Sequence, residues 1–547
     1  MAREGIEGHP LMKRLKDFLA ALFRGFREAR QATPAKARPS ASVIQQVPQS
    51  DSRSWATYAK GDFIGEKYEV HAVLGVGGFG VIYLVYSHER QVVYALKTLR
   101  DEFRDDERTK ERFRKEAKVW VDLDRHPYIL RASFVEEIEG RLYVAMDYIA
   151  PNEYGLNSLE GYLRQRPPDL VQSLRWALQF CHGMEYAYSR GVRCHRDIKP
   201  ANILIGQDNA LKISDFGLAA SFDMARGNPS IPGGLHETAL VALPGRTMEG
   251  IGFGTPTHMS PEQFTDAAGC DERSDIYSFG VVLFQMAAGG RLPFLAEVPK
   301  DGSAREAARF WMEMRALHTE CSAPTVNSPL SPLIQRCLKK ERSRRYQAFA
   351  DLRRDLKYLL INQFPVARPG SIAHAVPSEV VTDIFEQYEP VLEAWEWENK
   401  GLSLFHLGYF AQSLSCFERS IEINPHSAPA WNNRAMTLYQ LGRYQEAVNC
   451  FDKLLEMVQG HSHAWNNRGL SLSGMGLWGE ALASYEKALE IDPKDSWFWY
   501  HKAIAEDELG RKRDAANSFR QFLALAPPGF PAQIDYAQGW LQASRGV

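Results

Sequence analysis

A 34-residue repeat in the last third of the chain constrains its fold more than any other feature. Three columns of residues recur at this interval in four successive segments: one of tryptophan, one of glycine and one of other aromatic residues. The columns are Trp397, Trp431, Trp465 and Trp499; Gly408, Gly442, Gly476 and Gly510; and Phe417, Phe451, Tyr485 and Phe519. Such a period is typical of a solenoid of helical hairpins, because one hairpin cannot bury its apolar face alone and must stack on its neighbours.

The repeated residues also predict how each hairpin is built. The tryptophan is expected to pack between the two helices of its unit, and the glycine to allow the turn between them. Proline is expected to end the second helix at Pro425, Pro493 and Pro527, with Gln459 as the exception. Residues 394–527 therefore resemble a tetratricopeptide (TPR) array, and the resemblance implies a concave face that holds a peptide or protein ligand.

Two units of the repeat begin with the same four residues, Trp431–Arg434 and Trp465–Arg468. Their asparagines are expected to place polar groups on the first helix of each unit. These groups either hydrogen-bond an extended ligand or are ordinary positions of the repeat. Residues 528–547 are expected to form a C-terminal cap or tail.

The composition fits a soluble globular protein, with 45% hydrophobic and 24% charged residues. The net charge of −2 gives no reason to expect a nucleic acid partner. The seven cysteines are scattered and form no Cys-x-x-Cys pair, so neither a disulfide framework nor a zinc site is expected. No apolar run reaches the ~18 residues of a membrane-spanning helix, and a cytoplasmic location is expected.

Residues 1–30 are predicted to form a basic amphipathic helix. Large apolar residues recur at helical spacing, and basic residues flank them. The apolar residues are Leu11, Leu15, Phe18, Leu22 and Phe26, and the basic ones are Lys13, Arg14, Lys16, Arg24, Arg27 and Arg30. Residues 11–30 either dock on the protein itself or a partner, or lie at the periphery of an anionic membrane. Residues 31–60 are rich in Ala, Ser, Pro and Gln and are expected to be a flexible linker.

The middle of the chain changes from strands to helices. Five short strands and one charged helix are predicted first: strands near 68–74, 81–85, 92–96, 129–136 and 141–147, and a helix near 107–124. After Leu170 the pattern is mostly helical. Strands followed by helices indicate a mixed α+β domain and not an alternating parallel sheet. A second linker is expected at residues 361–391.

The most informative chemistry lies in the run His195–Asn202, which reads HRDIKPAN, and in Asp215-Phe216-Gly217. Two carboxylates, an amide and a lysine fall within about twenty positions of each other. Such a set can hold metal ions, orient a hydroxyl group and neutralise a phosphoryl group in transfer. Alone, each of these residues is more often a turn former or a cap, so the hypothesis of a phosphotransferase depends on the whole set.

A glycine-rich loop lies between the first two predicted strands. Its glycines, which let backbone amides approach a phosphate closely, are Gly75, Gly77, Gly78 and Gly80. The loop alone is a weak signal, but a strand follows it, and this excludes a dinucleotide fold, in which a helix would follow. Lys97 ends the third predicted strand. An isolated lysine there is usually a surface charge, but Glu116 on the next helix favours a role for Lys97 at the nucleotide phosphates.

In order and spacing, these motifs resemble a eukaryotic-type protein kinase domain over residues 66–360. The predicted fold class is therefore an α+β bilobal protein kinase fold followed by an all-α TPR solenoid. The resemblance implies ATP as the nucleotide and Mg²⁺ as the metal, with Mn²⁺ as an alternative. It also implies transfer of the γ-phosphate to protein hydroxyls, with the array recruiting a protein partner or substrate.

The resemblance also implies a role for each site residue. Asp197 is the catalytic residue that accepts or orients the proton of the substrate hydroxyl, and Lys199 steadies the transferred group. Asn202 and Asp215 bind the metal. Lys97 holds the phosphates, and Glu116 fixes its geometry. The other nucleotide-binding residues are the four glycines together with Ile82, Ala95, Met146, Asp147, Ile149 and Leu204.

Residues around the site refine this prediction. Lys199, together with Gly254-Thr255-Pro256, resembles serine/threonine kinases and not tyrosine kinases. Glu262 is expected to pair with Arg345 in a buried bridge, and Asp275 to brace the catalytic loop. Autophosphorylation is expected between residues 218 and 259.

The competing hypothesis is a catalytically inactive kinase fold that serves as a scaffold for the TPR array. Such folds usually lose the counterpart of Lys97, Asp197 or Asp215, and this chain keeps all three.

Overall fold

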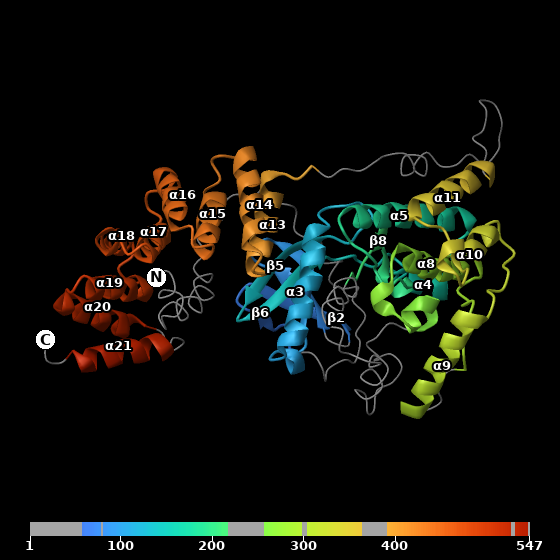
Figure 1. Cartoon of the computed structure of the whole chain (residues 1–547), viewed down its shortest axis with the longest axis horizontal. Helices are drawn as coiled ribbons and strands as arrows, with labels where there is room; N and C mark the ends of the chain where they lie inside the picture. The colour runs from blue at the N-terminus through green and yellow to red at the C-terminus, as the bar shows by residue number, and fades with distance from the viewer. Residues whose placement is uncertain are drawn as a thin grey trace, which may run out of the picture. The chain divides into compact units, whose positions relative to one another are not determined.

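The computed structural model describes residues 57–77, 80–216, 256–297, 304–363, 391–526 and 531–544. The described residues fall into two compact units, residues 57–363 and residues 391–544 (Figure 1). Several predicted features lie outside the described residues. They are the amphipathic helix of residues 1–30, Gly78, Gly217, the predicted phosphorylation segment up to residue 255, and residues 364–390 of the second linker.

A six-stranded antiparallel sheet forms the first lobe of the first unit. Its order is β1-β2-β3-β4-β6-β5. The strands are β1 (Phe63–Ile64), β2 (Tyr68–Val76), β3 (Gly80–Ser87), β4 (Val92–Leu99), β5 (Ala132–Ile138) and β6 (Arg141–Asp147). Helix α3 (Glu107–Asp122) contacts β5. Its buried side chains, which include Phe113, Ala117 and Trp120, recur at helical spacing and so form one apolar face.

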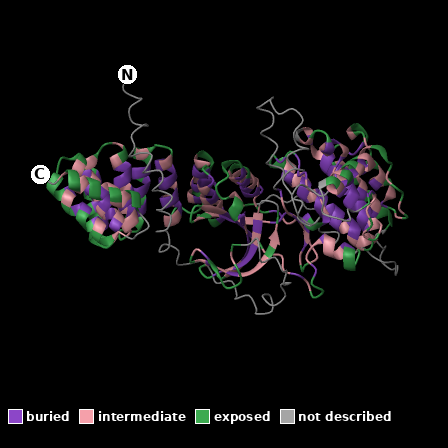
Figure 2. Cartoon of the chain, turned by 90° about the horizontal axis from the view of Figure 1, so that it is seen from below, coloured by how far each residue is buried: buried purple, intermediate pink, exposed green. Residues whose placement is uncertain are grey.

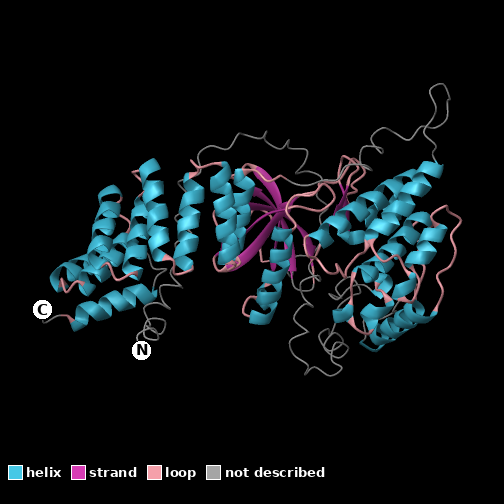
Figure 3. Ribbon diagram, turned by 45° about the horizontal axis from the view of Figure 1, so that its top comes forward, coloured by secondary structure: helices cyan, strands magenta, loops and turns pink. Residues whose placement is uncertain are grey.

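The second lobe is mainly helical, and Figure 3 shows its helices in cyan apart from the magenta strands of the first lobe. Its elements are α4 (Leu159–Gln165), α5 (Leu170–Ser189), β7 (Ile203–Ile205), β8 (Leu211–Ile213), α8 (Glu272–Ala287), α9 (Ala304–Glu320), α10 (Ser331–Cys337) and α11 (Phe349–Gln363). Helix α8 is buried along nearly its whole length, and Figure 2 shows buried residues filling the interior of this lobe. Phe180 and Phe279 stack face to face, with 4.0 Å between ring centroids, and join α5 to α8.

The observed elements differ from the predicted ones mainly at their ends. The two-residue strand β1 was not predicted, because two residues carry no alternation that a pattern could show. The strand predicted near 129–136 occupies Ala132–Ile138. Helix α11 continues to Gln363, so its last three residues are helical where a linker was predicted from 361.

The second unit is a row of helical hairpins followed by one further helix. The first helices of the four repeats are α13 (Ala394–His406), α15 (Ala428–Gln440), α17 (Ser462–Gly474) and α19 (Ser496–Glu508). The second helices are α14 (Phe410–Ile423), α16 (Tyr444–Met457), α18 (Trp478–Ile491) and α20 (Lys512–Leu525). Helix α21 (Pro531–Ala543) packs on α20, where a cap or tail was predicted.

The repeated residues explain this geometry. The four glycines of the repeat lie in the turns between the helices and have φ between 73° and 83°, a region that glycine enters without strain. A fourth column, not noticed in the sequence, lies in the first helices: Gly401, Ala435, Gly469 and Ala503. A Cβ atom on Gly401 would lie 2.8 Å from Phe417, and one on Gly469 would lie 2.5 Å from Tyr485. The two helices of a hairpin approach closely because this position is small.

The tryptophan column links neighbouring repeats, whereas its predicted packing between the two helices of one repeat stays a prediction. The indole N–H of Trp431 donates to the carbonyl of Pro425 at 2.9 Å, and that of Trp499 to Pro493 at 2.9 Å. The indole of Trp465 donates to Gln459 at 3.3 Å. Each tryptophan thus ties its unit to the end of the preceding one. Because the acceptor is a backbone carbonyl, glutamine can replace proline at residue 459.

Candidate active site

Strand pairing gathers the predicted nucleotide-binding residues on one face of the sheet. Ile82 pairs with Lys97, and Ala95 pairs with Met146. Because paired residues share a face and side chains alternate along a strand, these four side chains lie on the same side. Leu204 lies on β7 in the other lobe, half-buried between the buried Ile203 and Ile205.

Lys97 joins three elements of the unit. Its Nζ lies 2.5 Å from Oε1 of Glu116 on α3 and 2.9 Å from Oδ1 of Asp215, which follows β8. Burial favours the neutral amine, but the charges of Asp215 and Glu116 outweigh it and raise the pKa of Lys97. The charge of Lys97 in turn holds the pKa of Asp215 below the usual carboxyl range. The lysine is therefore a fixed positive charge between the lobes.

The catalytic-loop residues form a second cluster around Asp197. Lys199 donates to Oδ2 of Asp197 at 2.9 Å, and the amide nitrogen of Asn202 donates to both its backbone oxygen and Oδ2 at 2.8 Å. Burial raises the pKa of Asp197, and the charge of Lys199 opposes this rise. A buried carboxylate of raised pKa, fixed by two donors, is suited to accept a proton.

The metal-ligand prediction can be tested against the donor atoms present. Both bonds of Asn202 to Asp197 use its amide nitrogen, so its amide oxygen is turned away from Asp197. Asp215 has one oxygen bonded to Lys97, and its side chain is 43% exposed. The hydroxyl and amide of Ser214 both bond to the backbone oxygen of Asn202, at 3.0 and 2.9 Å, which ties the two candidate ligands together. Carboxylate and amide oxygens suit Mg²⁺, which also keeps water and phosphate oxygens as ligands.

The glycine loop and the hinge, which is the segment Asp147–Ile149 at the end of β6, supply backbone groups. The amide of Gly77 donates to the carbonyl of Gly80 at 2.8 Å, which joins the two described ends of the loop. Gly75 pairs with Ile82 on the adjacent strand. In the hinge, the Ile149 carbonyl accepts a bond from the Asn157 side chain at 2.9 Å.

Two hinge groups can be compared with the adenine contacts that the resemblance implies. The amide of Ile149 donates to no described residue, so it is available to an adenine edge. The amide of Asp147 is already used, because it donates to the carbonyl of Arg131 at 3.0 Å.

Asp275 braces the catalytic loop, as predicted. Its carboxylate accepts the backbone amides of His195 at 2.5 Å and Arg196 at 2.9 Å. Arg196 and Asp215 both have positive φ, 67° and 63°, in the left-handed region that non-glycine residues rarely adopt. Strained backbone of this kind persists where surrounding contacts determine it and is frequent at functional sites.

Sequence reasoning missed the aromatic contact that fixes Phe216. Trp120 meets Phe216 edge to face, with centroids 5.4 Å apart, and His195 lies 4.6 Å from the same ring. Trp120 lies four residues after Glu116, one helical turn further along α3. This spacing was a signal in the sequence, because it places both side chains on one face of the helix.

The predicted structural bridge is also present. Arg345, fully buried, forms two bonds to Glu262 at 2.7 and 2.9 Å, and Ser274 donates to the same carboxylate at 2.6 Å. Although burial opposes ionisation, these bonds and the charge of Arg345 lower the pKa of Glu262. The bridge fixes the segment after residue 256 on α8.

Similarity to known proteins agrees with this geometry. The family described as "Protein kinase domain" matches residues 68–355, and families described as "Tetratricopeptide repeat" match residues 398–448, 426–494 and 484–516. The serine/threonine-protein kinase PknD of Chlamydia caviae is 30% identical over 341 residues, 60% of this chain and 34% of that protein. The serine/threonine-protein kinase pkn3 of Myxococcus xanthus is 33% identical over 238 residues, 43% of this chain and 40% of that protein.

The chain thus spans less than half the length of these two relatives. The crystal structure of the Mycobacterium tuberculosis PknI kinase domain shares 20% identity, covering 56% of this chain and all of that one with a TM-score of 0.36. No described helix has the length and apolar character needed to cross a membrane. Because the kinase match extends over more than half of the 547 residues, the chain belongs to the protein kinase family and carries tetratricopeptide repeats in its last third.

Proposed function

We propose that the protein is an ATP-dependent serine/threonine kinase that phosphorylates protein hydroxyls. The observation that carries the proposal is the position of Lys97, which is bonded at once to Glu116 and Asp215. Phosphoryl transfer depends on positioning and on neutralisation of charge more than on covalent chemistry by the protein. A fixed cation beside a carboxylate supplies both.

The side chains of the candidate active site have separate roles in this proposal. Lys97 holds the nucleotide phosphates, and Glu116 keeps the lysine in place. Asp197 orients the substrate hydroxyl and receives its proton, while Lys199 neutralises charge on the transferred group. Asn202 and Asp215 would hold Mg²⁺ or Mn²⁺, which would supply positive charge beside the nucleotide phosphates. The oxygen-only donor set favours Mg²⁺ over softer metals.

Nucleotide recognition is assigned to the first lobe and the hinge. Ile82, Ala95, Met146 and Leu204 enclose the base, and the Ile149 amide donates to its edge. Gly75, Gly77, Gly78 and Gly80 cover the phosphates.

A phosphate-transfer assay tests the activity. The purified full chain is incubated with γ-labelled ATP, Mg²⁺ and a generic basic protein, and phosphoamino acids are identified afterwards. We expect label on serine and threonine with the wild type and none with Asp197→Ala. Asp208→Asn, which changes an exposed turn carboxylate in the same lobe, is the matched control and should behave as wild type. Equal label from wild type and Asp197→Ala would refute the proposal and leave the scaffold hypothesis.

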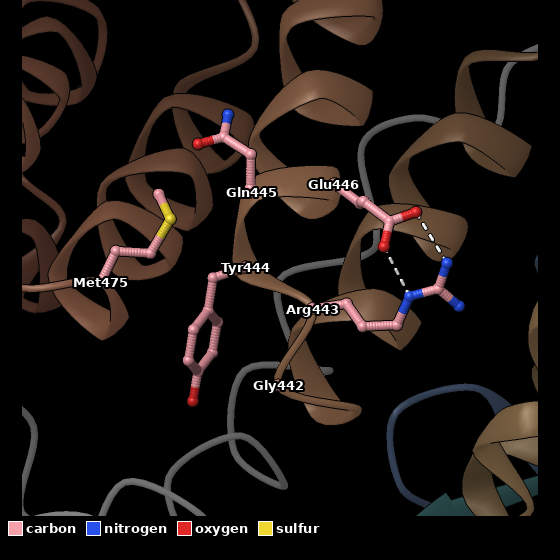
Figure 4. Close-up of a pocket in the computed structure, with 6 residues that line it drawn as sticks. All are labelled: Gly442, Arg443, Tyr444, Gln445, Glu446 and Met475. Carbon is pink, nitrogen blue, oxygen red and sulfur yellow. Dashed lines mark hydrogen bonds and ion pairs between the residues drawn. The ribbon is translucent and has the colours of Figure 1, made fainter. Parts of the chain in front are cut away.

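The TPR array is proposed to recruit a protein partner or substrate through its first helices. One pocket on the array lies outside the first helices, at the turn between α15 and α16. It is lined by Gly442, Arg443, Tyr444, Gln445, Glu446 and Met475 (Figure 4). There Arg443 and Glu446 pair with each other through two bonds of 2.7 Å, so neither charge is directed to a ligand. The asparagines of the first helices are engaged as well, because they are buried and Asn432 donates to Asn433 at 3.4 Å and Asn466 to Asn467 at 3.2 Å.

A further inference from the structure

The chain leaves the hinge at Ile149 and returns to it eight residues later. There the side-chain amide of Asn157 donates to the Ile149 carbonyl at 2.9 Å. Asn152 fixes the intervening loop, because its side-chain oxygen accepts the backbone amides of Tyr154 and Leu156, both at 3.0 Å. Its own backbone amide donates to the Leu156 carbonyl at 2.9 Å. Asn157 is therefore held beside the hinge by a hydrogen-bonded loop.

Asn157 is also bonded to the strand that carries Leu204, one of the residues proposed to enclose the base. Its backbone carbonyl accepts the amide of Ile205 on β7 at 3.0 Å. The next residue, Ser158, forms an isolated bridge with Leu204. The hydroxyl of Ser158 caps the N-terminus of helix α4, which fixes this point of the chain. One residue thus joins the hinge to an apolar side of the proposed nucleotide site.

The two backbone groups of Ile149 are used differently. Its carbonyl accepts the bond from Asn157, whereas its amide donates to no described residue. Only two dihedral angles separate the amide from the carbonyl, so a restrained carbonyl also limits how the amide turns. A donor that is held in one direction loses little conformational freedom when a ligand binds, and this improves affinity. The amide of Ile149 is therefore a fixed donor in the proposed nucleotide site.

A fixed donor distinguishes between purine bases. The ring nitrogen N1 of adenine is an acceptor, whereas N1 of hypoxanthine carries a hydrogen atom. A site that donates to this nitrogen rejects hypoxanthine, because two donors would then face each other. Adenine and hypoxanthine nucleotides differ only at this edge of the base, so the ratio of their affinities reports the direction of the hinge donor.

We propose that Asn157 is a positioning residue that selects adenine nucleotides. It acts through Ile149 and does not contact the base. By holding the Ile149 carbonyl, it directs the Ile149 amide to N1 of adenine. The inference deepens the proposed kinase function and rests on it, since it assigns the base specificity of the same site to a residue outside the hinge.

Gln207 provides a matched control on the same loop. Its side-chain amide donates to the Pro151 carbonyl at 3.0 Å. This bond resembles that of Asn157 in kind and length, but it holds a residue two positions beyond the hinge. Gln207→Ala therefore loosens the loop without releasing the Ile149 carbonyl.

The experiment measures nucleotide binding by the full chain in the presence of Mg²⁺. ADP and IDP, the hypoxanthine nucleotide, each displace a fluorescent ADP that is labelled on its ribose. The wild type should bind ADP more tightly than IDP. Asn157→Asp keeps the size of the side chain and removes its donor, so ADP affinity should fall about 2- to 12-fold, the net value of one neutral hydrogen bond. IDP affinity should stay near that of the wild type, so the preference for ADP falls by the same factor.

Further variants separate positioning from other effects. Asn157→Ala should lose the same preference, which shows that the missing donor and not the new charge is responsible. Gln207→Ala should keep both affinities of the wild type. In assays of phosphate transfer, the KM for ATP should rise in both Asn157 variants while kcat stays near the wild-type value, because Lys97 still holds the phosphates. Circular dichroism melting confirms that each variant is folded.

Four outcomes would overturn the inference. They are no preference for ADP in the wild type, an unchanged preference in either folded Asn157 variant, an equal loss of ADP and IDP affinity in these variants, and an equal effect of Gln207→Ala. Phosphate transfer by the wild type is measured on the same samples. ADP binding without transfer refutes the kinase proposal, and the ratio of the two affinities still decides the role of Asn157. Transfer by the wild type together with an unchanged ratio in the variants refutes only the role of Asn157.

Discussion

The bond between Lys97 and Glu116 offers the sharpest test of the proposed activity. Glu116→Gln keeps the size of the side chain and removes its charge. Lys97 then keeps Asp215 at 2.9 Å as its remaining carboxylate partner, so the penalty of about 3–5 kcal/mol for an unpaired buried charge does not apply. What is lost is one charge-assisted hydrogen bond, worth about 1.5–3 kcal/mol. At about 1.4 kcal/mol per tenfold, kcat/KM for ATP should fall about 10- to 150-fold.

The assay measures initial rates of phosphate transfer over a range of ATP concentrations. Glu111→Gln is the matched control, because Glu111 lies on the same helix, is 49% exposed, and reaches Lys115 and Arg114 only at 3.6 and 3.9 Å. Exposed pairs of this kind contribute little, so its rate should stay within about twofold of wild type. If folded Glu116→Gln is as active as Glu111→Gln, Lys97 does not depend on Glu116 for its position, and the proposed arrangement of the site is wrong.

Three further predictions concern stability. Glu262→Ala leaves the buried Arg345 without its carboxylate and should destabilise the first unit by about 3–5 kcal/mol, measured by urea unfolding. Burial lowers the pKa of His258 to about 4, so the unfolded chain binds this proton first. Stability should therefore fall by up to about 3 kcal/mol as the pH drops from 6.5 to 4, and less in His258→Gln. Gly469→Leu forces a side chain against Tyr485, whose ring is 2.5 Å from an added Cβ, and should lower the melting temperature of the array, whereas Ala503→Gly should cost only about 1 kcal/mol.

The array was readable from sequence because its contacts are local and repeated. Tryptophan is rare, with 12 in the chain, so its column stands out at the 34-residue interval, and the glycine column recurs in step with it. The small-residue column that includes Gly401 and Ala435 was missed, because glycine and alanine alternate in it and no single residue type recurs at the 34-residue interval. Only the ring of Phe417, which would meet a Cβ on Gly401 at 2.8 Å, shows why that position is small. The ring on the second helix sets the requirement for a small residue on the first helix, so the column of small residues alone does not reveal it.

The residues of the candidate active site could be predicted from sequence motifs instead of from a repeat. The identities of Lys97, Asp197 and Asp215 followed from motifs, but their contacts did not follow from spacing. Lys97 and Asp215 are 118 residues apart, and the intervening chain supplies α3, β5 and β6 of the first lobe and α4, α5, β7 and β8 of the second. Trp120 shows most clearly that such contacts cannot be predicted from sequence. It reads as one apolar residue of an amphipathic helix, and its contact with Phe216 depends on how that helix is placed against the loop after β8.

The conformation of the catalytic loop depends both on its own sequence and on residues far along the chain. Arg196 has a φ of 67°, which costs a non-glycine residue on the order of 1–3 kcal/mol, and no local pattern in the HRDIKPAN run accounts for it. The compensation comes from Asp275, 79 residues later, whose carboxylate accepts the amides of both His195 and Arg196. Helix α8, which holds Asp275, is itself fixed by burial and by the Glu262–Arg345 bridge. The strained backbone conformation of Arg196 is therefore stabilised by the core of the second lobe. Asp275→Asn should then relax the loop and lower kcat, while the distant pair of Lys97 and Glu116 keeps nucleotide affinity near that of the wild type.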